Sequence, residues 1–219
     1  MHTGWSKSDL DDYKKARRDR LRLYSKTDDI LYNMCSEWSD HKNVGIVQAK
    51  VRIIGRVYAT GLERKGKRDK TRGIYETIAK ILHENRVWID SEIKGLNKFR
   101  SLSPSSYEKI LSFHGNMVKI LRKGTRSKLN FRSFVSKYLH FHVPIVPLFD
   151  SVASNTINRS DWYPWKDSDP HMAIIPKRKV FDPIYYRFFK QFLFYFSDLE
   201  KQKLYPTVRD ADWFLIWSA

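Results

Sequence analysis

Cysteine is almost absent from this 219-residue sequence, because Cys35 is its only one. A single cysteine excludes a disulfide within the chain and a zinc site built from several cysteines, so we expect no metal. Long apolar runs are also missing: we find no stretch of about 18 apolar residues and no signal-peptide core in the first residues. These absences predict a protein of a reducing compartment, the cytoplasm, without a membrane segment.

Acidic residues are scarce relative to basic ones. Lys and Arg number 41 against 24 Asp and Glu, which gives a formal net charge of +17. This excess predicts a polyanionic partner such as nucleic acid. Phe, Tyr and Trp make up 15% of the chain, whereas a disordered basic tail would be poor in them. We therefore expect one folded domain, residues 1–219, and a monomer.

The alternation typical of strands is rare, while helical spacing and capping signals recur along the chain. Capping boxes are predicted for Ser8 with Asp11 and for Ser105 with Glu108, and helix starts for Asp182-Pro183 and Thr207. The fold class predicted is all-α. The expected helices run from Ser8 through Leu23, after Thr27 through Trp38, Val44 to Leu62, Ile74 to Leu82, Val87 to Phe99, Ser103 to about Leu121, about Phe131 to Phe141, Asp182 through Phe196, and Thr207 through Trp217.

A short basic connection lies between the helices that end near Leu121 and begin near Phe131. Backbone N–H groups in such a hairpin, residues 122–131, can hold phosphates. A solvated basic turn is the alternative interpretation, and the same two readings apply to the basic stretch 63–72. The residues that we predict to contact phosphates are Lys123, Gly124, Arg126, Lys128 and Arg132.

The segment after the helix that contains Lys137 is extended by two prolines, Pro144 and Pro147, and ends at Asp150, where a new helix can begin. Residues 158–180 show no regular period and form a long predicted loop, and such loops are often functional. His140 and His142 have no carboxylate or cysteine partners at ligand spacing. We therefore interpret both histidines as packing residues and not as metal ligands.

From Ser112 to Ala153, the order of helix, basic hairpin, helix, proline-bearing stretch and aspartate resembles the helix-hairpin-helix DNA glycosylase superfamily. The resemblance implies two helical lobes with a cleft between them, a catalytic segment at about residues 132–153, and Asp150 at the mouth of the cleft. The family's usual hairpin, Leu-Pro-Gly-x-Gly, is replaced here by a stretch in which Gly124 stands alone. Bifunctional members carry a lysine at the start of the second helix, where this chain has Phe131 and Arg132. The resemblance therefore favours a monofunctional enzyme similar to the 3-methyladenine glycosylases.

Asp150 suits the chemistry that the resemblance implies. Breaking an N-glycosidic bond builds positive charge on the sugar, which a nearby carboxylate stabilises while it orients water. The alternative is a plain helix N-cap. Lys137 could attack the sugar carbon and form a Schiff base if its pKa were lowered, or it could be a structural lysine.

A base must leave the duplex to be cut, and aromatic side chains hold it by stacking. Trp162, Tyr163 and Trp165 are candidates for that base pocket, or they anchor their loop to the core. We thus predict a DNA glycosylase that binds double-stranded DNA, uses no cofactor, and removes an oxidised, alkylated or phage-modified base. A non-catalytic helical DNA- or RNA-binding protein is the alternative, and a peripheral membrane protein is a weaker one.

Overall fold

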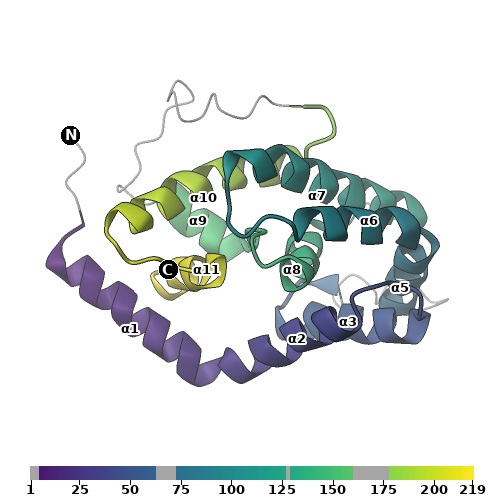
Figure 1. Cartoon of the computed structure of the whole chain (residues 1–219), viewed down its shortest axis with the longest axis horizontal. Coiled ribbons are helices and arrows are strands. Elements are labelled where there is room, and N and C mark those ends of the chain that lie inside the picture. The colour runs from purple at the N-terminus through teal and green to yellow at the C-terminus, as the bar shows by residue number, and fades with distance from the viewer. Residues whose placement is uncertain (1–4, 63–72, 127–128, 160–177) are drawn as a thin grey trace.

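The computed structural model describes residues 5–62, 73–126, 129–159 and 178–219. These ranges form ten α-helices and contain no strand, which confirms the all-α prediction (Figure 1). None of these helices is both long enough and apolar enough to cross a membrane. The helices are α1 (Lys7–Leu23), α2 (Ser25–Glu37), α3 (Val44–Val57), α5 (Ile74–Glu84), α6 (Arg86–Leu96), α7 (Pro104–Gly124), α8 (Arg132–His142), α9 (Ser151–Arg159), α10 (Pro183–Lys201) and α11 (Val208–Trp217).

Two of the predicted helix starts are confirmed. The Asp182 side chain accepts hydrogen bonds from the backbone N–H groups of Ile184 and Tyr185 at the start of α10. Thr207 and Asp210 form a reciprocal capping box at the start of α11. These signals are local, so neighbouring residues are enough to satisfy them.

Two other predicted caps are wrong by two residues. The capping box of α1 is formed by Ser6 with Asp9, and Trp5, just before it, is held by a 2.6 Å hydrogen bond from its Nε1 to Asp198. The cap of α7 is Ser103 with Ser106, which places Pro104 at the first helical position. Both regions contain more than one serine that could cap the helix, so the sequence alone does not decide which serine is the N-cap.

The third helix is shorter than predicted. It ends at Val57 and not at Leu62, because the backbone turns through positive φ values at Ala59 (47°) and Gly61 (74°). A helix cannot continue through such left-handed residues. Tyr58, just before this turn, contacts α8 through its backbone carbonyl, which accepts a hydrogen bond from Lys137.

The helices pack in two groups. The first group is a connected set of five helices: α3, α5, α6, α7 and α8. In the second group, α11 contacts both α1 and α9, and α9 also contacts α10. Helix α2 contacts α1, α3 and α8 and so joins the groups (Figure 1). The segment from Val143 to Asp150 leads from α8 in the first group to α9 in the second. Asp150 therefore lies where the chain passes between the groups.

Candidate active site

The connection between α7 and α8 is shorter than the predicted hairpin. Helix α7 continues to Gly124, so that residues 125–131 join two helices that pack against each other. A Cβ at Gly124 would lie 2.6 Å from Cδ1 of Ile81, so glycine allows the end of α7 to approach α5. Arg126, with a φ of 49°, turns the chain.

The predicted phosphate-binding residues lie in different surroundings. Lys123 and Arg126 are exposed beside the connection, and Lys128 lies outside the described residues. Arg132 is buried and pairs with Asp182 through two hydrogen bonds, 2.5 Å from Nε to Oδ1 and 2.9 Å from the second guanidinium nitrogen to Oδ2. Its guanidinium also lies over the ring of Phe149. Arg132 therefore holds the start of α8 to the start of α10.

The structure brings the two predicted catalytic residues together. Nζ of Lys137, on α8, donates a 2.7 Å hydrogen bond to Oδ2 of Asp150 and a 2.8 Å hydrogen bond to the backbone carbonyl of Tyr58. The Lys137 side chain is 4% exposed, and that of Asp150 is 20% exposed. The pair joins α8 to the start of α9, 13 residues later, and the carbonyl that completes it comes from 79 residues earlier in the chain.

Asp150 also begins α9. Its Oδ1 accepts a 2.8 Å hydrogen bond from the backbone N–H of Val152, and its carbonyl accepts one from Ser154. Burial acts to raise the pKa of this carboxyl group, but the charge and hydrogen bond of Lys137 outweigh burial, so that the pKa lies below its ordinary value. Asp150 is therefore ionised at neutral pH. The hydrogen bonds from Lys137 and Val152 hold the carboxylate in one orientation, while part of the side-chain surface stays accessible.

A buried network of charges adjoins this pair. Arg209, on α11, donates hydrogen bonds to Asp28 (3.1 Å) and Asp212 (2.7 Å). Asp28 also accepts hydrogen bonds from Arg20 and from the hydroxyl group of Tyr58, the residue whose carbonyl binds Lys137. Burial raises the pKa of Asp212 to about 6, with the charge of Arg209 acting in the opposite direction.

Sequence reasoning missed all five members of this network: Arg20, Asp28, Tyr58, Arg209 and Asp212. The spacing of Arg209 and Asp212 by three residues in a predicted helix indicates an ion pair on one helical face. It does not indicate that the pair is buried. Nothing in the sequence relates Asp28 to Tyr58 or Arg209, because these contacts join α2 to the end of α3 and to α11.

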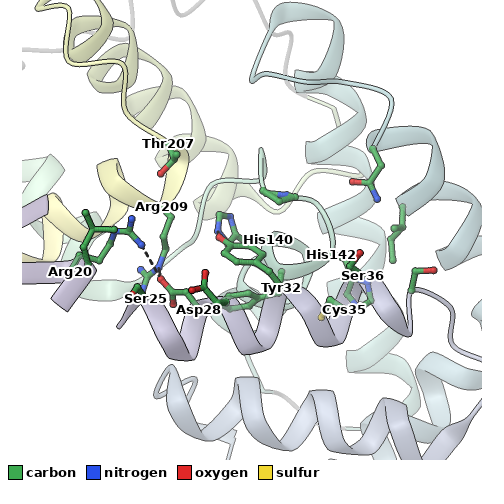
Figure 2. A pocket seen from close by; sticks show the side chains of 17 residues that line it. Arg20, Ser25, Asp28, Tyr32, Cys35, Ser36, His140, His142, Thr207 and Arg209 are labelled. Atoms are coloured by element: carbon green, nitrogen blue, oxygen red, sulfur yellow. Dashed lines mark hydrogen bonds and ion pairs between the residues drawn. The ribbon is translucent and has the colours of Figure 1, made fainter. Parts of the chain in front are cut away.

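A pocket of about 640 Å³ shares Asp28 and Arg209 with this network. Asp28 and Arg209 line it together with Tyr32, His140 and His142 (Figure 2). His140 donates from Nδ1 to the carbonyl of Val146 (2.8 Å), so its Nε2 accepts the hydroxyl of Tyr32 at 2.5 Å. Asp150 and Lys137 are not among the lining residues.

Both histidines of α8 lie in the core, as their interpretation as packing residues predicts. Burial lowers the pKa of His140 to about 3 and the pKa of His142 well below its ordinary value. Among the residues that the structure describes, no cluster of His, Cys, Asp or Glu side chains could hold a metal ion. The predicted base-stacking residues Trp162, Tyr163 and Trp165 lie outside the described ranges, as does the basic stretch 63–72.

Comparison of this chain with protein-family models, with curated proteins and with solved structures found no match.

Proposed function

We propose that this chain is a DNA N-glycosylase, which binds duplex DNA, takes a base that has left the stack, and hydrolyses its bond to deoxyribose with Asp150. The observation that carries this proposal is the ion pair of Asp150 with Lys137, at 2.7 Å, in which the carboxylate keeps 20% of its side-chain surface exposed. A carboxylate that is fixed yet accessible suits a reaction that builds positive charge on a sugar.

Lys137 has a positioning role in this proposal. Its ammonium group donates to the carboxylate and to the carbonyl of Tyr58, which fixes the direction of the accessible carboxylate surface. Preorganised charges contribute most when they need not reorient during the reaction. Because Lys137 is buried and occupied in this way, the proposed enzyme is monofunctional.

Duplex binding is attributed to the exposed basic side chains. Lys123 and Arg126 lie at the turn between α7 and α8, on the group of helices that also carries Lys137. A chain with a net charge of +17 binds phosphates with an affinity that falls as salt concentration rises. The target base is an oxidised, alkylated or phage-modified one, which a panel of substrates distinguishes.

The test is base release from duplex oligonucleotides that each contain one candidate base. Abasic sites are revealed by alkaline cleavage, and DNA affinity is measured in parallel by fluorescence anisotropy. Asp150→Asn keeps the size of the side chain and one oxygen, which can either cap α9 or accept from Lys137, and removes the charge, so we expect product to disappear while affinity persists. Asp11→Asn, an equal charge change at an exposed position of α1, is the control and should retain full activity.

Borohydride trapping separates the two roles of Lys137. We expect no covalent adduct with DNA, because the proposed reaction uses water as the nucleophile. An adduct that disappears in Lys137→Gln would replace the monofunctional proposal with a bifunctional one.

A second candidate, a non-catalytic helical nucleic-acid-binding protein, is favoured by one observation. Both oxygens of Asp150 have partners, Oδ2 with Lys137 and Oδ1 with the N–H of Val152, as a purely structural cap would. Salt-dependent binding to DNA or RNA without release of any tested base, by the wild type and by Asp150→Asn alike, would support this candidate and contradict the first.

A further inference from the structure

The pocket beside Tyr32 and His140 is not used by the proposed reaction. Its volume of about 640 Å³ is within the range of roughly 300–1,000 Å³ typical of small-molecule sites. Figure 2 shows its arrangement along α2, with Arg20, Asp28 and Arg209 at one end, Cys35, Ser36 and His142 at the other, and Tyr32 with His140 between them.

At the charged end of the pocket the buried charges are paired with one another, and the exposed Asp29 is a further lining carboxylate. Asp28 accepts hydrogen bonds from Arg20 and Arg209, and Arg20 and Arg209 also contact Asp210 and Asp212. Buried charges that satisfy one another do not attract an additional ion. Arg20 and Arg209 are thus occupied, and the Asp29 carboxylate repels negative charge, so the pocket is not a site for an anionic ligand.

The other end carries uncharged hydrogen-bonding groups. His142 is buried, lines the pocket, and has no hydrogen-bond partner for either ring nitrogen among the described residues. Burial keeps its imidazole neutral, so that one nitrogen is a donor and the other an acceptor. Buried polar groups without a partner are rare because each costs free energy, and rotation of an imidazole about its Cβ–Cγ bond can present a nitrogen to a ligand.

Uncharged polar side chains also line the pocket. Ser36, Ser39 and Asn97 are exposed lining residues with both donor and acceptor atoms. Aromatic rings are close by, because Tyr32 contacts Phe141 with ring centroids 5.0 Å apart, and both residues line the pocket. Such a lining provides flat apolar surface together with neutral hydrogen-bonding groups.

From these observations we propose that the pocket binds a small, neutral, flat heteroaromatic molecule that carries both a hydrogen-bond donor and an acceptor, of the chemical class of a nucleobase or nucleoside. This site is separate from Asp150, and the inference does not depend on the glycosylase proposal. The ligand can come from two sources, as a free molecule or as an unpaired base within a strand.

The experiment titrates the full chain with free adenosine, guanosine, cytidine, thymidine and uridine by ligand-observed NMR, and separately with a short single-stranded oligonucleotide. Ser36→Phe fills the pocket from an exposed position on α2 and should leave the fold intact. Ser197→Phe, also exposed but on α10 and not among the lining residues, is the matched control.

We expect saturable binding that Ser36→Phe weakens at least tenfold and Ser197→Phe leaves unchanged. If the free nucleosides show this pattern, the ligand is a free molecule. If only the oligonucleotide shows it, the ligand is an unpaired base within a strand. His142→Phe keeps the ring contacts with His41 and Tyr138 but removes both nitrogens, and should weaken binding to a similar extent. Should that variant fail to fold, Ser36→Phe still decides. The proposal is overturned if neither arm shows saturable binding, or if binding is the same in the wild type and in Ser36→Phe.

Discussion

Replacement of Asp212 by Asn should change how the stability of this protein depends on pH. Burial raises the pKa of this carboxyl group from 3.8 to about 6 in the folded chain, so the folded state binds a proton more tightly than the unfolded state. A group of this kind stabilises the fold below its unfolded pKa, and that contribution is lost as pH rises through the folded pKa. The wild type should therefore lose stability from Asp212 as pH increases from 4 to 7.

The magnitude follows from the two pKa values. A difference of about 2 pKa units corresponds to a loss of about 3 kcal/mol, of which about 2 kcal/mol develops between pH 4.5 and 7.5. Asp212→Asn removes this titration. The free energy of unfolding of the variant, relative to the wild type, should therefore rise by about 2 kcal/mol over that interval.

Urea unfolding followed by circular dichroism, at several pH values from 4.5 to 7.5, measures this difference. Asp40→Asn is the control, because hydrogen bonds from Lys42 hold the pKa of Asp40 below its ordinary value, so its contribution changes only at lower pH, and Asp40 is remote from the Asp212 network. The Asp40→Asn difference should therefore be constant over the same interval. A difference for Asp212→Asn that is constant, or that falls with pH, would refute the assignment of a raised pKa to Asp212.

Three further substitutions test the packing and the surface. Gly115→Ala places a Cβ 2.0 Å from the backbone oxygen of Val180. Thermal melts should show that this variant loses more than about 2 kcal/mol of unfolding free energy. An unchanged melting temperature would contradict the close approach. Arg132→Ala leaves the buried carboxylate of Asp182 without its cation, with only the N–H donors of α10, and urea titration should show a loss of about 3 kcal/mol. Arg126→Ala should leave stability within about 0.5 kcal/mol of the wild type but reduce by about 1 the slope of log affinity for DNA against log salt.

The sequence predicted the helices well where the determining interactions are local. The Thr207 box and the Asp182 cap depend on residues within one turn, so the pattern alone was sufficient. The end of α3 was predicted too far along the chain, because Val57, Tyr58 and Leu62 continue a helical spacing while Ala59 adopts a left-handed conformation that no strong local signal announces.

The site was predicted in part. Asp150 and Lys137 were both identified as candidates, but each separately, and their ion pair was not foreseen. The pair depends on the carbonyl of Tyr58, 79 residues earlier in the chain, and on the turn of the proline-bearing segment. Such geometry is set by tertiary packing, which periodicity and motif spacing do not contain. The pocket along α2 was missed for the same reason, since Tyr32 and His142 resemble ordinary core residues in the sequence.

Asp28 has a consequence for any shortened form of this protein. Its carboxylate is 1% exposed and is shared by a donor from α1, one from the end of α3 and one from α11. A chain that stops before Thr207 would leave this anion in the interior with one guanidinium fewer, at a cost of several kcal/mol. Deletion of the last helix should therefore also loosen the first, although nearly two hundred residues separate them, and truncation series should keep both ends or neither.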